Sequence, residues 1–208
     1  MTAPQRAACI LLGTVVLAMV TGCAVREQRP AGAWLEEREQ LFDGIDHWSV
    51  SGRVALSDGQ RGGSLGFEWL ARGDQHEVRL RTLAGGRQWR LEFGPGHAFL
   101  EGSEVGQMRG RDPDPLVEAA VGWPIPVAEL AWWIRGLIPP EKRHQVSFAE
   151  DGTLDFAITE PWSIDFQRFS HAGPVLMPSR IQADSDPYRV RIVLRNWNLA
   201  ANGETKSL

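Results

Sequence analysis

Cysteine is scarce in this chain, with two residues among 208, both within the first 23 positions. This excludes a small domain stapled by disulfides. Basic residues are fewer than acidic ones, 22 against 26, and the formal net charge is -4. Nucleic-acid binding is disfavoured, because it needs a concentrated basic surface. A hydrophobic content of 43% excludes a disordered chain, and this length can bury a substantial core in one domain or at most two small ones.

Motifs for catalysis or metal binding are also few. The sequence has no G-x-x-x-x-G-K-[ST] phosphate loop, and its five histidines stand without a second ligand at metal-binding spacing. Residues 62–66 match the G-x-S-x-G nucleophile elbow of hydrolases. That elbow needs a strand that turns sharply into a helix, whereas Ser64 follows a glycine-rich turn and leads into a strand pattern. We therefore predict no enzyme, no catalytic residue and no metal, and keep a hydrolase using Ser64 as an alternative.

The longest uncharged run lies at the start of the chain. Residues 1–6 are mildly basic, residues 7–20 are mostly apolar, and the small residues Thr21 and Gly22 precede Cys23. This order is typical of a secretory signal. A membrane-spanning helix is the alternative, but glycine and threonine dilute the run and no aromatic belt marks its ends.

The tetrad Val20-Thr21-Gly22-Cys23 resembles a bacterial lipobox. Such a signal implies cleavage before Cys23, which then carries a diacylglycerol and an acyl chain. Two or more chains anchor a protein stably. In lipoproteins of this type, Asp at the residue after the lipidated cysteine is the usual signal for retention in the inner membrane. Residue 24 is Ala here, which is compatible with delivery to the outer membrane. The predicted organisation is a signal peptide (1–22), a lipidated cysteine and tether (23–32), one domain (33–199) and a polar tail (200–208).

A hydrophobic period of two dominates the predicted domain. From Trp48 onwards, large apolar residues alternate with polar ones, and turn signals separate the runs. Six strands are expected before the central helices and five after them, about eleven in all. The five later strands are expected at 144–148, 153–159, 162–169, 180–183 and 188–197. Helical spacing predicts helices over 33–42, 116–121 and 127–137. The expected fold is mainly β with helices, an antiparallel sheet whose apolar face must be covered or filled.

One turn carries an apolar residue where polar residues are usual. Leu83, in the turn at 82–86, is either the last residue of the preceding strand or an exposed tip that inserts into a membrane or a partner. The pattern alone favours the first interpretation. The turn is flanked by four basic residues of a kind that solvated strands often carry, namely Arg79, Arg81, Arg87 and Arg90.

Several segments together resemble the LolB family of outer-membrane lipoproteins. The resemblance covers essentially all of the predicted mature chain. Besides the lipobox, it is carried by W-x-x-x-G-R at 48–53, G-x-P-I-P at 122–126, and the closing N-W at 196–197. Each element is weak alone, whereas the combination is specific.

The resemblance implies an open half-barrel of about eleven strands, capped by three α-helices and enclosing a hydrophobic cavity for acyl chains. The candidate lining residues are Trp48, Val54, Phe67, Trp69, Leu80, Trp89, Leu91, Trp133, Phe156 and Phe166. The family also has a protruding loop with a membrane-inserting leucine, which matches Thr82, Leu83, Ala84 and Gly85 here. The family often has a proline before this leucine, whereas this chain has Thr82.

The function that the resemblance implies is reception of lipoproteins from the periplasmic carrier LolA and their insertion into the outer membrane. The expected partners are LolA, the acyl chains of cargo lipoproteins and the inner leaflet of the outer membrane. The receptor is expected to be a monomer on the periplasmic face, with no cofactor other than the lipid on Cys23. An alternative is a lipid-anchored structural or assembly lipoprotein with a filled barrel that binds only protein.

Overall fold

A computed structural model describes residues 30, 32–84, 86–142 and 145–200. The signal peptide, Cys23 and most of the tether lie outside these residues. Within them are three α-helices, one short 3-10 helix and eleven strands. None of these helices has the length and apolar content needed to cross a bilayer. In chain order the elements are α1 (Ala33–Asp43), β1 (His47–Ser57), β2 (Gly62–Arg72), β3 (Gln75–Thr82), β4 (Gln88–Gly94), β5 (His97–Gly102), β6 (Gly106–Gly110), α2 (Pro113–Val121), α3 (Val127–Trp133), η1 (Pro140–Lys142), β7 (Gln145–Phe148), β8 (Leu154–Thr159), β9 (Trp162–Ala172), β10 (Val175–Ser185) and β11 (Tyr188–Ala200).

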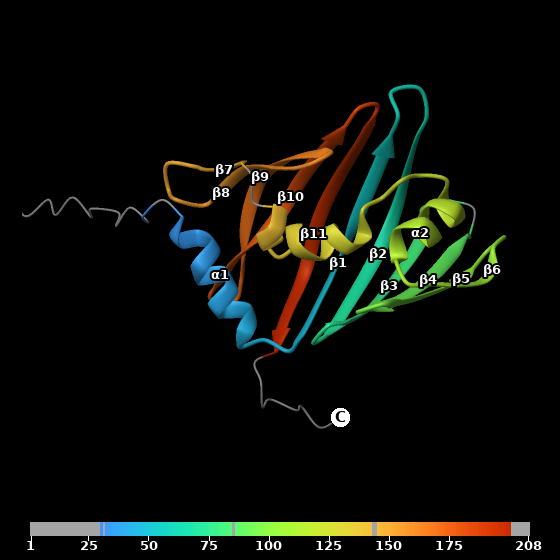
Figure 1. Ribbon diagram of the computed structural model, residues 1–208, viewed down its shortest axis with the longest axis horizontal. Coiled ribbons are helices and arrows are strands. Elements are labelled where there is room, and N and C mark those ends of the chain that lie inside the picture. The colour runs from blue at the N-terminus through green and yellow to red at the C-terminus, as the bar shows by residue number, and fades with distance from the viewer. Residues whose placement is uncertain (1–29, 31, 85, 143–144, 201–208) are drawn as a thin grey trace, which may run out of the picture.

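The eleven strands form one antiparallel sheet in the order β6-β5-β4-β3-β2-β1-β11-β10-β9-β8-β7. The sheet is open, with β6 and β7 at its edges. All pairings join consecutive strands except the one between β1 and β11 at the centre. The three α-helices lie against the same face of this curved sheet (Figure 1). The predicted fold class, a mainly β open half-barrel with three helices, is confirmed.

Helices α2 and α3 lie in the connection between the two edge strands (Figure 1). We call this connection, residues 111–142, the strap. Helix α2 begins where the Asp112 side chain accepts a 3.0 Å hydrogen bond from the Asp114 N–H. Helix α3 ends at Trp133, four residues earlier than predicted, because Gly136 has a φ of 75° that a continuing helix does not allow. The strap therefore runs across the sheet from one edge to the other.

Helix α1 joins the far end of the strap to the second half of the sheet. The Trp34 indole N–H donates a 2.9 Å hydrogen bond to the carbonyl oxygen of Gly136. The same indole makes an edge contact with the Phe169 ring of β9, with 4.9 Å between ring centroids. Arg38, which is 4% exposed, lies over the Trp34 ring and donates to the sulfur of Met177 in β10. The contacts of Trp34 and Arg38 thus hold α1 against the strap and against β9 and β10.

Strand β10 is longer than the sequence pattern predicts, eleven residues instead of the four at 180–183. Met177 and Pro178 are both buried although they are neighbours, and the register with β9 shifts after Pro178. An irregularity of this kind interrupts the alternation of apolar and polar residues, which is the signal that sequence analysis reads. The prediction was therefore too short at this strand.

The strands at the centre of the sheet pack closely at a glycine. Gly52 of β1 pairs with Leu194 of β11 on one side and Phe67 of β2 on the other. A Cβ at this position would overlap the carbonyl oxygen of Val193 and lie 2.8 Å from the Phe67 ring. Only a hydrogen atom fits here, so the glycine sets how closely the strands approach.

Candidate functional site

An apolar space lies between the first half of the sheet and the strap. Its volume is about 40 Å³ and no polar atom contributes to its exposed lining. The sheet lines it from β1 to β4 and β11, and helices α2 and α3 cover it together with the segment between them. The lining residues are Val54, Phe67, Trp69, Val78, Leu80, Leu91, Val117, Ile125, Val127, Leu130, Ile134 and Ile192.

Five of the ten predicted lining residues border this space: Val54, Phe67, Trp69, Leu80 and Leu91. Four others are buried elsewhere in the same core, Trp48 against Trp69, Trp89, Trp133 against Trp162, and Phe166 against Phe169. The Trp89 indole N–H donates to the carbonyl oxygen of Ser103, 3.1 Å away. Period-two alternation therefore identified the covered face of the sheet, but it did not separate residues around the space from residues packed beside it.

Phe156 is the exception among the predicted lining residues. It pairs with Asp165, whereas its neighbour Ala157 pairs with the fully buried Ile164. Paired residues project from the same face of a sheet, so Phe156 lies on the face opposite Ala157 and Ile164. The sequence run at 153–159 carries apolar residues on both faces, and for that reason the inward set was chosen wrongly there.

The strap supplies residues that sequence reasoning missed. Val117, Ile125, Val127, Leu130 and Ile134 all border the space from the helix side. The spacing of Leu130 and Ile134, four residues apart on a predicted helix, identifies a buried face but not the surface against which it packs. Helical periodicity could have placed these residues in the core, and only the chain topology places them opposite β1 to β4.

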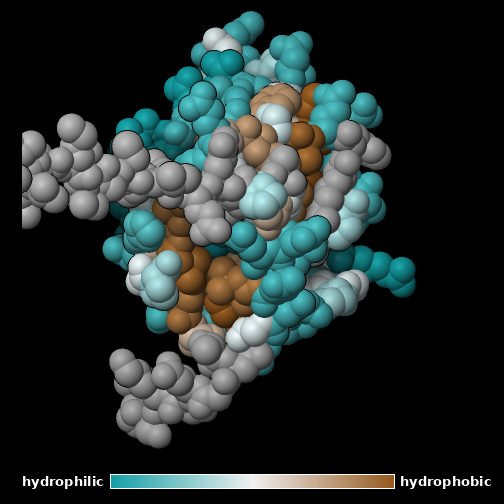
Figure 2. Space-filling model, turned by 90° about the vertical axis from the view of Figure 1, so that its left-hand side faces the viewer, coloured by the Kyte–Doolittle hydropathy of each residue, from teal (hydrophilic) through white to brown (hydrophobic). Residues whose placement is uncertain are grey.

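The space is small in this structure. A free volume of about 40 Å³ is far smaller than an acyl chain of many methylene groups. An acyl chain of many methylene groups does not fit unless the strap moves away from the sheet. Figure 2 shows that apolar surface nevertheless reaches the exterior in a hollow on the side where α1 lies, between hydrophilic flanks. The covering of the apolar face is thus incomplete on this side.

Two carboxylates hold the helices of the strap. Asp114 accepts a 3.1 Å hydrogen bond from the Ala128 N–H and so links the starts of α2 and α3, and its burial raises its pKa to about 6. Glu129 of α3 accepts a 3.1 Å hydrogen bond from the Thr159 hydroxyl of β8 and pairs with Lys142. Helix α3 is therefore tied to α2 on one side and to β8 on the other, while its contacts around the apolar space lack such bonds.

A half-buried histidine supports the wall of the space. The Trp69 indole N–H donates a 3.1 Å hydrogen bond to Nδ1 of His76, which must be unprotonated to accept it. The imidazole stacks on Phe93 with 4.7 Å between ring centroids. Burial, helped by the positive charge of Arg135, lowers the His76 pKa to about 4. Protonation of His76 would thus remove a contact that orients a lining residue.

We expect acid to destabilise the fold through His76. Its pKa is lower in the folded chain than the ordinary 6.5, so the unfolded chain binds more protons between pH 6.5 and 4, and stability falls as the pH decreases through this window. The expected loss is on the order of 2 kcal/mol between pH 7 and about pH 4.5. His76→Asn keeps an acceptor but does not titrate. Urea unfolding at both pH values should show a smaller loss in this variant, and an equal loss would exclude His76 as the cause. Asp114 titrates in both proteins and cancels in the comparison.

The turn between β3 and β4 presents the predicted leucine to solvent. Leu83 is 53% exposed and is the one large exposed hydrophobic residue in the described ranges. Ala84 is also exposed, and Gly85 lies outside the described residues. The expectation that Leu83 merely ends the strand is wrong, because β3 ends at Thr82.

Thr82 closes the base of this turn. Its N–H donates a 2.9 Å hydrogen bond to the Arg87 carbonyl oxygen, and its hydroxyl accepts a 3.2 Å bond from the Arg87 N–H. A proline at this position could not donate the first bond. The threonine thus supplies by hydrogen bonding part of the rigidity that a proline ring would supply by fixing φ.

The alternative site at Ser64 lacks the geometry of a nucleophile elbow. Ser64 lies within β2, opposite Ala55 of β1, and not at a turn from strand to helix. No cluster of three or more His, Cys, Asp or Glu side chains able to hold a metal occurs in the part of the chain that the structure describes.

Comparison with known proteins gives consistent matches. Residues 46–197 match the family model "Outer membrane lipoprotein LolB". Relatives named outer-membrane lipoprotein LolB include that of Pseudomonas fluorescens, 29% identical over 87% of this chain and 91% of the relative, and that of Stutzerimonas stutzeri, 28% identical over 90% and 94%. A solved structure of a DUF1329 family protein from Desulfovibrio piger is similar in fold alone, with a TM-score of 0.55, 7% identity, and coverage of 85% of this chain and 92% of that one.

Proposed function

Since the chain belongs to the LolB family of outer-membrane lipoproteins, we propose that it accepts lipoproteins from a periplasmic carrier of the LolA type and inserts them into the outer membrane. The observation that carries this proposal is the wholly apolar space between the sheet and the strap. A site with this lining favours hydrocarbon and offers no polar partner to any other ligand.

The energetics of the cargo explain why such a site is needed. Each methylene group of an acyl chain gains about 0.8 kcal/mol on leaving water, so exposure of several chains during transfer is prohibitive. A second apolar cavity that meets the mouth of the carrier's cavity avoids this exposure. The transfer needs no nucleotide and no covalent chemistry if affinity rises from carrier to receptor to bilayer.

The receptor must open to accept an acyl chain. The contact between α2, α3 and strands β1 to β4 is apolar around the space, whereas Glu129 ties α3 to β8. We infer that α2 and α3 bow away from β1 to β4, while the strap stays attached to β6 at one end and near β8 at the other. Because Asp114 links the two helices, they are expected to lift together.

The anchor belongs to the same proposal. We propose that Cys23 carries the lipid and holds the receptor at the membrane that finally accepts the cargo. An anchor raises the local concentration of that membrane around the receptor. All described helices and strands lie between residues 33 and 200, so a form that starts at Ala24 retains every one of them. Such a form is suited to separating acceptance of cargo from anchoring.

The small size of the space favours a second candidate function. With only 40 Å³ free, the chain could instead be a lipid-anchored structural or assembly lipoprotein whose interior stays filled. Such a protein would bind partners by its surface and would never contact the acyl chains of a cargo.

Photocrosslinking should distinguish the two functions. We expect benzoylphenylalanine in place of Phe67, which lines the space, to crosslink to the acyl chains of a labelled lipoprotein offered on the carrier. The same residue in place of Phe156 should not, since Phe156 lies on the other face of the sheet. Both changes replace one phenylalanine in a strand. Soluble, folded variants that both fail to crosslink, while an equivalent photoreactive residue at Leu130 fails too, would favour the filled barrel.

A further inference from the structure

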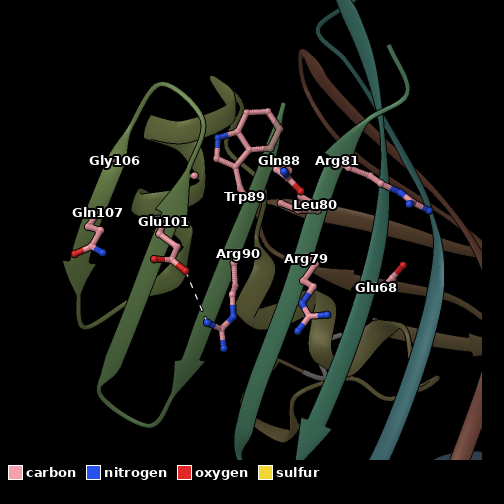
Figure 3. Close-up of a pocket in the computed structure, with 11 residues that line it drawn as sticks. Glu68, Arg79, Leu80, Arg81, Gln88, Trp89, Arg90, Glu101, Gly106 and Gln107 are labelled. Carbon is pink, nitrogen blue, oxygen red and sulfur yellow. Dashed lines mark ion pairs between the residues drawn. The ribbon is translucent and has the colours of Figure 1, made fainter. Parts of the chain in front are cut away.

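A broad groove crosses the face of the sheet that points away from the helices. Its volume is about 640 Å³, and side chains from β2 to β6 line it (Figure 3). The strand register arranges these side chains in rows. One row runs across the sheet through Glu68, Arg79, Arg90, Glu101 and Gln107, each paired with the next.

The arginines of this row are neutralised by carboxylates. Arg79 pairs with Glu77 at 2.7 Å. Arg90 pairs with Glu77 at 3.4 Å, with Glu101 at 3.7 Å, and also with Glu92 (Figure 3 shows the pair with Glu101). The positive charges of Arg79 and Arg90 are therefore compensated within the sheet, and these side chains attract an external anion only weakly.

The adjacent row, nearer the β3–β4 turn, carries no carboxylate. From β1 to β4 it consists of Arg53, Gly66, Arg81 and Gln88, and Arg53 is exposed. Arg81 is exposed and occurs in none of the ion pairs formed among the described residues. A Cβ on Gly66 would lie 3.2 Å from Nε of Arg81, so the arginine stem rests over β2 where a side chain is missing. Arg81 thus presents an uncompensated guanidinium to the groove.

A second arginine, Arg87, lies on the β4 side of the turn. Arg87 is hydrogen bonded through its backbone to Thr82. Its guanidinium pairs with Glu104 at 3.2 Å, but both side chains are more than half exposed, at 51% and 70%. An exposed pair of this kind contributes little and exchanges readily for another anion. Arg81 and Arg87 therefore bracket Leu83, two residues before it and four after it.

We propose that Arg81 and Arg87 form a binding site for the phosphate of an anionic phospholipid headgroup at the membrane surface. The proposal rests on the proposed function, the insertion of cargo into the outer membrane, and on the expectation that Leu83 enters that membrane. A leucine side chain flanked by guanidinium groups matches the layered chemistry of a bilayer surface, with hydrocarbon below and phosphate above. Arginine binds phosphate through paired N–H donors.

Charge complementarity favours an anionic lipid surface over an acidic protein as the partner of this site. The chain as a whole has a formal charge of -4, so an anionic surface repels most of it, and only a local cationic site can set its orientation. The arginines of the neighbouring row are neutralised by carboxylates, and Arg53, the other arginine in the row of Arg81, lies on β1, separated from β3 by β2. The exposed Leu83 beside it favours a bilayer over an acidic protein, since a leucine on an acidic rim would gain nothing.

Flotation with vesicles tests the proposal. The form that starts at Ala24 is mixed with phosphatidylcholine vesicles, with or without phosphatidylglycerol, at low and high salt. We expect tighter binding to the anionic vesicles, by roughly tenfold or more at low salt, and loss of this preference at high salt. Arg81→Gln together with Arg87→Gln should abolish the preference and leave binding to phosphatidylcholine unchanged.

The matched control removes the same charge elsewhere. Arg168→Gln with Arg195→Gln changes exposed arginines of β9 and β11 and should leave the preference intact. Equal loss in both double variants, or no preference in the parent, would overturn the proposal. So would normal vesicle binding combined with slower uptake from the carrier, which would assign the arginines to an acidic protein. If the parent takes up no cargo at all, the proposed function fails, while the vesicle result still decides for or against the headgroup site.

Discussion

Leu83→Glu is expected to leave the fold intact and to stop delivery of cargo into membranes. Leu83 is 53% exposed in a turn beyond the end of β3, so the sheet loses no core contact when it is replaced. Burial of a leucine side chain in hydrocarbon gains about 1.5–3 kcal/mol, and a glutamate carboxylate instead opposes entry. Together these effects predict a decrease of roughly a hundredfold or more in transfer to vesicles.

The measurement is transfer of a labelled lipoprotein from the carrier, through the lipid-anchored receptor, into vesicles. Leu83→Met keeps an apolar side chain of similar volume and should transfer normally. Uptake from the carrier by Leu83→Glu should also be normal, because the apolar space lies elsewhere. If the glutamate variant delivered cargo at the parental rate, Leu83 would have no part in the mechanism.

Gly52→Ala is expected to have the largest effect on stability. The new methyl group would overlap the Val193 carbonyl oxygen and press on the Phe67 ring at 2.8 Å. The carbonyl oxygen belongs to the backbone of β11, so it cannot yield without moving β11 away from β1, the one pairing in the described sheet that joins strands distant in sequence. Overpacking of this kind typically costs 1–3 kcal/mol, and contact with backbone places this case at about 3 kcal/mol or above.

Thermal and urea unfolding of the two alanine variants should separate this effect from the general effect of replacing a glycine. Gly63→Ala is the matched control, since a Cβ on Gly63 of β2 meets no atom within 4 Å. Its stability should equal that of the parent or exceed it slightly, because alanine restricts the unfolded chain. A Gly52→Ala protein with the parental unfolding midpoint would show that the strands part at no cost. The structure thus gives a physical reason for the glycine in the W-x-x-x-G-R pattern.

Sequence predicts the fold well where one physical signal dominates. The alternation at Trp48, Val50 and Val54 marks a strand with one covered face, and the structure places all three in the core. The prediction fails where two signals compete. At Phe156 both faces of the strand carry apolar residues, and at Met177 the register shifts, so alternation no longer identifies the inward side.

The candidate site was less accessible to sequence reasoning than the fold. Pairing of β1 with β11 joins residues about as distant as the domain permits, and no local pattern encodes it. The opposition of Leu130 to Leu80 across the apolar space follows from this topology. The partner of His76 is also invisible in sequence, since an isolated histidine between polar neighbours is ordinarily solvated, whereas here it accepts the Trp69 N–H.

The strap is fastened at both ends to the two free edges of the sheet, β6 and β7. A lid with a single hinge can swing without disturbing what it covers, but a span between two edges cannot. If the edges move apart, the span is drawn taut, and if they approach, it gains slack and can bow outward. The curvature of the sheet and the height of the helices above it are therefore one mechanical variable, and anything that bends the sheet from outside also sets the room beneath the helices.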